Sequence, residues 1–214
     1  MARRRDAGYE AQREMILARA AHLFARRGYP ATSMNEVAEA CKLSKASLYH
    51  YYRDKYSLLL SIAEGHVSRL KRVVNEVEER RLPADQELRE LIRRFLGEYA
   101  DARDAHRVLT EDVRFLKERD RERVLGQERA VVEGFARAVG RLRPQLRRAS
   151  LAKPLTMLLF GMINWLFTWM KAEGALNYGT LAPMVADLFL GGLGAVKVPR
   201  AAAARAVAIE PVVG

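Results

Sequence analysis

Residues 32–55 read TSMNEVAEACKLSKASLYHYYRDK, and the rest of the chain can be interpreted outward from this stretch. Ser33 is a favourable N-cap, and Glu36 follows it at the spacing of a capping box, which predicts a helix that begins at about Met34. Ser44 is a second N-cap, so a second helix is expected after a tight turn. The stretch therefore predicts two short helices joined by a turn.

The second of these helices, which is expected to run to about residue 51, has the composition of a helix that lies in a DNA major groove. Leu48 falls on its inward face, whereas its leading turn consists of small, polar and basic residues. Short side chains let a helix backbone approach base edges, and flanking hydroxyls and cations bind phosphates. The residues expected outside or at the rim are Lys45, Ala46, Ser47, Tyr49 and His50.

The longer run GYPATSMNEVAEACKLSKASLYHYYRDKYSLLLSI resembles the DNA-binding domain of the TetR/AcrR family of bacterial transcriptional repressors. The similarity covers roughly residues 10–64, with ordered matches at Thr-Ser, Val-Ala-Glu-Ala, Ser-Lys-x-Ser-Leu-Tyr-His-Tyr and the following Lys55. Lys42 and Ala46 stand where glycine is common in the family. A left-handed Lys42 would cost about 1–2 kcal/mol, and the methyl group of Ala46 would suit a thymine.

The resemblance implies a ligand-responsive repressor that binds a palindromic DNA operator as a dimer. It implies that Lys45, Ala46 and Ser47 face bases, and that phosphates are held by Thr32, Tyr49, His50 and Lys55. The full predicted DNA-binding set is Thr32, Ser33, Ser44, Lys45, Ala46, Ser47, Tyr49, His50 and Lys55.

The charge of the chain agrees with a polyanionic partner. The 214 residues carry a formal net charge of +11, and residues 1–56 contain 11 basic against 6 acidic side chains. A generally arginine-rich composition is the alternative explanation of this surplus. A second basic cluster, with no acid between its members, consists of Arg141, Arg143, Arg147, Arg148 and Lys153.

The sequence offers no catalytic residues, no cofactor motif and no metal site. Cys41 is the only cysteine, so an intrachain disulfide is excluded and a reducing cytoplasm fits. The four histidines have no partner at metal-ligand spacing, and His66 and His106 are expected to be surface residues or satisfied helix residues. The expected mechanism is binding and the chain is not expected to be an enzyme.

Apolar periodicity predicts an all-α fold. The expected domains are a three-helix helix-turn-helix DNA-binding domain at 1–54, a helical ligand-binding and dimerisation domain at 55–198, and a flexible tail at 199–214. Residues 1–8 are expected to be a mobile basic arm. Beyond the two short helices, helices are expected over about 9–27, 55–80, 83–102, 104–118, 121–142, 154–170 and 180–196.

Residues 154–170, PLTMLLFGMINWLFTWM, contain no charge and approach the lower length limit of a membrane span. Gly161 and Asn164 in the middle, the proline at the start and the symmetric flanks Lys153 and Lys171 argue against a span. A helix that is apolar on all sides is expected to be buried on both sides. The last two helices are therefore predicted to form the dimer interface, in agreement with the resemblance.

The run GMINWLFTWMKAEGALN, followed by a helix ending in LFLGGL, is similar to sequences of the TetR-family branch whose members respond to fatty-acyl or other CoA thioesters. An acyl body in an apolar pocket, with its phosphates near residues 141–153, would explain the second basic cluster. A plain core, a lipophilic drug acting on a repressor of an efflux gene, and a nonspecific architectural DNA-binding role are the alternatives. The candidate ligand lining is Phe95, Tyr99, Phe115, Phe135, Met162, Trp165 and Trp169.

Overall fold

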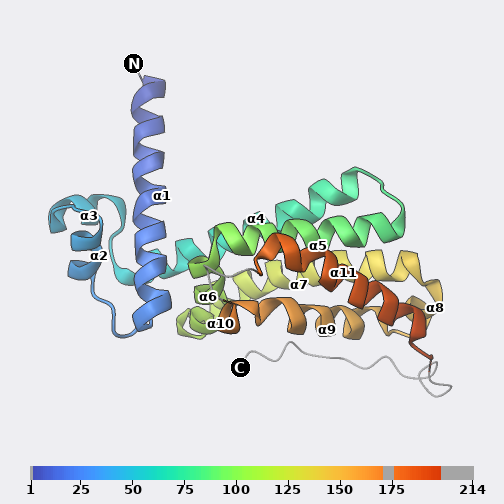
Figure 1. Cartoon of the computed structure of the whole chain (residues 1–214). Helices are drawn as coiled ribbons and strands as arrows, with labels where there is room; N and C mark the ends of the chain where they lie inside the picture. Colours follow the sequence, from blue (N-terminus) through green and yellow to red (C-terminus); the bar gives the residue numbers. More distant parts are fainter. Residues whose placement is uncertain (1, 171–175, 199–214) are drawn as a thin grey trace. The chain divides into compact units, whose positions relative to one another are not determined.

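The computed structural model describes residues 2–170 and 176–198, and every regular element in those ranges is a helix (Figure 1). The predicted all-α fold class is therefore confirmed. The chain forms two compact units. Unit 1 consists of residues up to 67 together with 102–124, and unit 2 consists of 68–101 together with the described residues from 125 onward. The predicted boundary at residue 54 stays a prediction, and the predicted tail lies outside the described residues.

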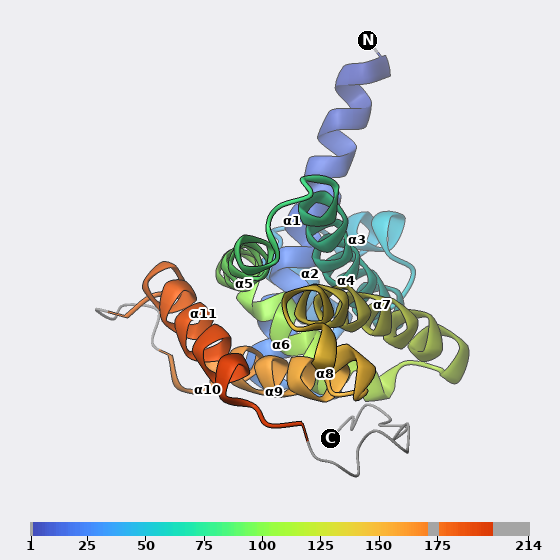
Figure 2. The ribbon, with the colours of Figure 1, turned by 90° about the vertical axis from the view of Figure 1, so that its right-hand side faces the viewer.

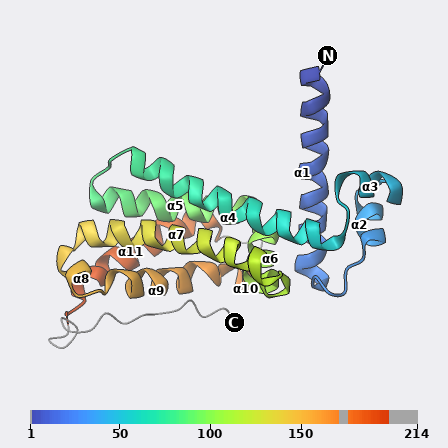
Figure 3. The same ribbon diagram turned by 180° about the vertical axis from the view of Figure 1, so that it is seen from behind.

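Unit 1 surrounds a core of residues from helices α1, α2, α3 and α6 and the first turns of α4. Helix α1 packs against α6 and α2, and α2 and α3 lie to one side of it (Figure 3). The elements of this unit are α1 (Ala2–Arg27), α2 (Met34–Ala40), α3 (Lys45–Tyr51), the start of α4 (Lys55–Glu79), α6 (Arg103–Asp112), the short 3₁₀ helix η1 (Val113–Phe115) and the start of α7 (Glu118–Leu142).

The N-terminal helix is longer than the sequence suggested. Residues 1–8 were expected to be an arm, but α1 begins at Ala2, and that expectation is wrong for the described part. The segment ahead of Tyr9 is rich in alanine and arginine, which favour helix, and only Asp6 and Gly8 have poor helix propensity. Gly28 ends the helix with φ +83°, donating its N–H to the carbonyl of Phe24 at 2.7 Å.

Unit 2 is a helical bundle in which α11 packs along α5 (Figure 2). Its aromatic centre is formed by Phe95, Phe135 and Phe160, whose ring centroids lie 4.7–6.0 Å apart in edge-to-face arrangements. Its elements are the end of α4, α5 (Ala84–Asp101), the rest of α7, α8 (Pro144–Arg148), α9 (Ala152–Asn164), α10 (Leu166–Trp169) and α11 (Tyr178–Ala195). Helix α8 was not expected from apolar periodicity, although Pro144 in its first turn is a usual start signal.

The predicted continuous helix over 154–170 is wrong, because α9 ends at Asn164 and α10 begins at Leu166. Thr168 donates both its backbone N–H (3.2 Å) and its hydroxyl (2.7 Å) to the carbonyl of Trp165. These i−3 bonds tighten the turn and compete with the regular α-helical pattern.

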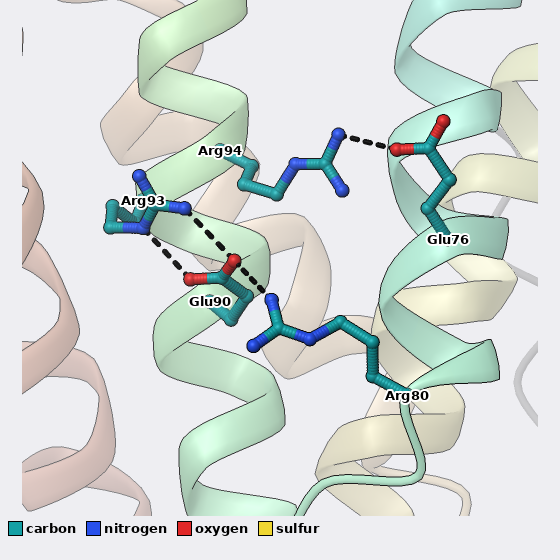
Figure 4. A network of polar contacts seen from close by, with 5 residues as sticks. All are labelled: Glu76, Arg80, Glu90, Arg93 and Arg94. Carbon is teal, nitrogen blue, oxygen red and sulfur yellow. Dashed lines mark hydrogen bonds and ion pairs between the residues drawn. The ribbon is translucent and has the colours of Figure 1, made fainter.

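Ion pairs connect the end of α4 with α5 in unit 2 (Figure 4). The carboxylate of Glu90 accepts from Arg80 at 2.7 Å and from Arg93 at 2.8 and 2.9 Å, and Arg94 donates to Glu76. The hydrogen bond from Arg93 is the main reason why the pKa of Glu90 lies below its ordinary value. Pairs this near the surface contribute little stability each, so their main effect is to select which faces of the two helices meet.

At Gly134 of α7, the side chain of Val74 on α4 occupies the space that a Cβ would need. A Cβ at this position would lie 2.3 Å from Cγ1 of Val74 on α4. Gly134→Ala is therefore expected to lower the free energy of unfolding by about 1–3 kcal/mol, because the two helices would have to separate. Urea unfolding followed by circular dichroism measures this. Gly126→Ala on the same helix meets only the end of a flexible arginine at 3.7 Å and should stabilise by a few tenths to about 1 kcal/mol. Equal effects of the two variants would contradict the assigned helix contact.

Candidate functional site

Helix α2 begins with the predicted capping box. Glu36 N–H donates to Ser33 Oγ at 3.3 Å, and Ser33 N–H donates to the Glu36 carboxylate at 2.7 Å. The backbone hydrogen bond from Ser33 is the largest cause that lowers the pKa of Glu36. The predicted start at Met34 is confirmed. The hydroxyl of Ser33, a predicted DNA contact, lies at the surface but is engaged in this cap.

The turn between α2 and α3 is built around a left-handed lysine. Lys42 has φ +54°, and Leu43 N–H donates to the carbonyl of Ala38 at 2.9 Å, closing the turn. The left-handed conformation considered from sequence is thus present, with its cost of about 1–2 kcal/mol. The turn places the exposed ammonium of Lys42 next to the start of α3.

Helix α3 presents the predicted reading face. Its N-cap Ser44 accepts from Ser47 N–H at 3.1 Å, and the two serine hydroxyls lie 2.7 Å apart. Leu48 is fully buried and anchors the helix on unit 1. The remaining predicted contacts of this helix are brought together on the exposed side: Ser44, Lys45, Ala46, Ser47, Tyr49 and His50. A supported helix with small, polar and basic exposed residues has the chemistry needed for groove binding.

Two residues that were predicted to contact phosphate, Thr32 and Lys55, form hydrogen bonds within the protein instead. Thr32 is buried, and its hydroxyl donates to the carbonyl of Gly28 at 3.0 Å. Lys55 Nζ donates to the carbonyls of Tyr29 and Pro30 at 2.8 and 3.0 Å and lies 4.6 Å from the centroid of the Tyr29 ring. Both residues therefore hold the turn that precedes α2, because their partners lie in residues 28–30.

An aromatic contact at α1 was missed from sequence. Tyr9 stacks on Tyr51 with ring centroids 4.9 Å apart, and His50 meets both rings edge-on. The guanidinium of Arg13 lies 5.6 Å from the centroid of the Tyr52 ring. These contacts fix α1 against the end of α3, next to the predicted reading face. Their partners lie about 40 residues apart in the chain, so no local pattern marks them.

The segment after α6 packs against the same turn within unit 1. Phe115 lies 5.5 Å from the Tyr29 ring, centroid to centroid, so this predicted ligand-lining residue belongs to unit 1. Tyr56 on α4 donates to Asp120 at 2.6 Å and accepts from Lys117 N–H at 3.1 Å. The start of α4 is thus held to the start of α7 by hydrogen bonds.

The two histidines that sequence patterns left without a role meet inside unit 1. His66 and His106 are buried, and Nε2 of the first lies 3.3 Å from Nδ1 of the second. Residues 2–170 and 176–198 contain no group of three or more ligand-type side chains that would hold a metal ion.

The seven predicted ligand-lining residues do not form one surface. Phe95, Tyr99 and Phe135 are buried in unit 2. Trp165 and Trp169 are 62% and 54% exposed and Met162 is also exposed, so the helix is not buried on both sides within one chain. The exposed apolar face of unit 2 comes from α9–α10, α11 and the residue before Asn177. Its residues are Leu158, Met162, Trp165, Trp169, Leu176, Met184 and Leu188.

The second basic cluster is largely engaged within unit 2. Arg141 pairs with the buried Glu87, and Lys153 lies 2.9 Å from Glu133. Arg143 donates to the carbonyl of Leu193 near the end of α11. These three of the five cations therefore have partners outside the cluster, two of them carboxylates and one a backbone carbonyl, which a count of the cluster's own charges does not include. Arg147 and Arg148 are exposed.

Within the ranges that the structure describes, no helix is both long enough and apolar enough to span a membrane.

Two family models match this chain. The model described as bacterial regulatory proteins of the tetR family matches residues 16–62, and the model described as the tetracyclin repressor-like C-terminal domain matches residues 81–193. A curated relative, the uncharacterized HTH-type transcriptional regulator YerO of Bacillus subtilis, is 30% identical over 94 residues, which is 44% of this chain and 32% of that protein. The match thus spans about a third of that relative's length.

Solved structures match over most of the chain. A TetR-family transcriptional regulator from Bordetella parapertussis is 35% identical with a TM-score of 0.79, covering 86% of this chain and 97% of the other. AibR, solved in complex with isovaleryl coenzyme A and operator DNA, is 24% identical with a TM-score of 0.72, covering 83% and 97%. At 24% identity, the similarity to AibR shows a shared fold alone.

Proposed function

The chain belongs to the TetR family of bacterial transcriptional regulators, and we propose that it is a repressor that binds a palindromic DNA operator as a dimer and is released by a small apolar effector. The observation that carries the proposal is helix α3, which is anchored by the buried Leu48 and carries Lys45, Ala46 and Ser47 on its exposed side. This role is regulatory, requires no catalysis and places the protein in the cytoplasm.

The exposed apolar face of α9–α10 and α11 supports the dimer. Leu158 and Leu188 are 66% and 70% exposed in the single chain, and both helices contact each other within unit 2. Exposed apolar residues gathered on two helices that contact each other are expected, on a regulator of this kind, to be covered by a second copy of the chain. A two-fold axis through this face would relate two α3 helices, each of which covers too few bases alone.

An acyl-CoA is one candidate effector. AibR, whose complex contains isovaleryl coenzyme A, supports the class by fold, and Arg147 and Arg148 are exposed cations available to phosphates. The engagement of Arg141, Arg143 and Lys153 within unit 2 weakens the original reason for expecting a CoA site.

The proposal is tested by selecting DNA fragments with the purified full chain and sequencing them. A dimeric repressor should enrich an inverted repeat whose half-sites are separated by about one helical turn or somewhat more, about 34–36 Å at the shortest. The selected fragment should bind at least about a thousandfold more tightly than random duplex at fixed salt. Equal affinity for all duplexes would instead identify the nonspecific architectural protein considered from sequence.

A further inference from the structure

The turn between α2 and α3 closes with the two hydrogen bonds of a Schellman motif. Leu43 N–H donates to the carbonyl of Ala38, five residues back, at 2.9 Å. Lys42 N–H donates to the carbonyl of Glu39, also at 2.9 Å, and Lys42 has φ +54°. Glycine usually occupies this left-handed position, because it has no Cβ to approach the neighbouring carbonyl oxygen. The geometry of the turn alone would therefore favour glycine over lysine here.

The two neighbours of Lys42 fix the direction in which its side chain leaves the turn. Cys41 is buried, and Leu43 is partly buried against the core of unit 1. A hydrophobic contact of this kind accompanies many Schellman motifs. Lys42 itself is exposed. The turn is thus anchored on both sides by apolar residues, and the lysine between them extends away from the core.

The ammonium of Lys42 has no counter-charge within unit 1. No carboxylate in residues 2–170 and 176–198 forms an ion pair with it, whereas Arg27 of the same unit pairs with Glu36. The sequence from Ala40 to Arg53 contains no acidic residue. This end of unit 1 therefore carries unbalanced positive charge, which attracts a polyanion.

The position of the turn in a helix-turn-helix gives this charge a specific neighbour. In such proteins the first helix crosses the DNA backbone and the second enters the major groove with its leading residues on base edges. Lys42 lies three residues before Lys45, the first residue of α3, and thus between these two helices. A residue at this point is expected at the edge of the groove, where the phosphates are. A lysine ammonium on its flexible stem binds phosphate as a point charge.

We propose that Lys42 binds a phosphate at the edge of the major groove in each half of the operator, in addition to the contacts assigned to α3. This inference deepens the proposed function and rests on it. The stability lost by placing lysine in a left-handed conformation is offset, on this account, by affinity for DNA. Because a phosphate contact carries no sequence information, Lys42 should strengthen binding to every duplex rather than select a sequence.

The test compares three substitutions at one position. Lys42→Gln removes the charge and keeps the strained conformation, Lys42→Gly removes both, and Lys42→Arg keeps both. Binding of each full-length protein to labelled selected operator and to random duplex is measured by fluorescence anisotropy over a salt series. The glutamine and glycine variants should bind both duplexes about threefold or more weakly at low salt. They should lower the slope of log affinity against log salt by about 0.9 for each bound subunit, and Lys42→Arg should match the parent.

The stability of the free protein separates the charge from the turn. Lys42→Gly should unfold at a higher temperature than the parent, because glycine adopts positive φ without strain. A loss of affinity in a more stable protein cannot be due to poorer folding. Arg81→Gly is the matched control, since Arg81 is an exposed cation with φ +49° in the α4–α5 turn of unit 2. It should raise the unfolding temperature in the same way and leave DNA binding unchanged.

Each contrary result overturns a specific part of the inference. A parental salt slope in Lys42→Gln, together with specific operator binding, would refute the phosphate contact alone. Weaker binding by Lys42→Gly but not by Lys42→Gln would assign the effect to the backbone of the turn instead. A Lys42→Gly protein that unfolds at a lower temperature than the parent would refute the strain argument. Equal affinity of the parent for both duplexes, with a lowered slope in Lys42→Gln, would refute the palindromic operator and support the phosphate contact.

Discussion

Leu188→Glu is expected to convert the protein to a monomer and to lower its affinity for the selected operator by at least about a hundredfold. Leu188 is 70% exposed on α11, and it belongs to the apolar face that we assign to a second copy of the chain. In a two-fold interface each substitution occurs twice, so two carboxylates would be buried together. Removing a charge from water without a partner costs several kcal/mol, and about 2.7 kcal/mol already corresponds to a hundredfold.

The loss of DNA affinity follows from the loss of the dimer, because a monomer places one α3 helix in one groove. Sedimentation equilibrium and fluorescence anisotropy on labelled operator measure the two effects at the same protein concentrations. Leu158→Glu on α9 is a second member of the same face and should act in the same way. Asp187→Asn is the matched control, since Asp187 faces α5 and pairs with Arg89. If the Leu188→Glu protein stays dimeric, the dimer interface lies on another surface.

What could be read from the sequence was mainly what depends on neighbours within one or two turns. Ser33 with Glu36, and Ser44 with Ser47, are three residues apart, and the geometry of a helix start brings each pair together in any context. The inward position of Leu48 follows from the helical period in the same way. The two helices and the exposed face of α3 were therefore predictable.

Contacts between distant parts of the chain were not predictable. Lys55 lies 25 and 26 residues from the carbonyls that its ammonium reaches, and Arg141 lies 54 residues from Glu87. From the charges in the sequence alone, both residues would be counted as cations without partners. Their hydrogen-bond partners are brought close only by the fold. The apolar run 154–170 likewise placed its two tryptophans on an apolar face. An apolar face that is buried in a core and one that is exposed for binding another chain have the same composition. The exposure of Trp165 distinguishes them.

The second large effect is expected at Lys55. Resemblance to the family implies a phosphate contact, whereas the structure shows its ammonium bonded to the carbonyls of Tyr29 and Pro30 and close to the Tyr29 ring. Both roles can coexist, because an ammonium has three donors, of which two are used here. Lys55→Met keeps the length of the side chain and removes its charge. It should weaken binding to operator and to random duplex alike by about tenfold and reduce the slope of log affinity against log salt by about one.

The structure adds an expectation that a phosphate contact alone does not give. Losing two charge-assisted hydrogen bonds from a partly buried lysine should also lower the free energy of unfolding of the free protein by about 1–3 kcal/mol. Urea unfolding without DNA measures this separately from the salt slope. A changed slope with unchanged stability would refute the role in holding the turn, and changed stability with an unchanged slope would refute the phosphate contact.

Ser47→Ala provides the comparison with Lys55→Met, because Ser47 is exposed on the leading turn of α3. It should lower affinity for the selected operator by about 1–3 kcal/mol, leave random duplex unaffected and change the preferred base at its position. Equal losses on both duplexes for both variants would contradict the separate roles of the two residues.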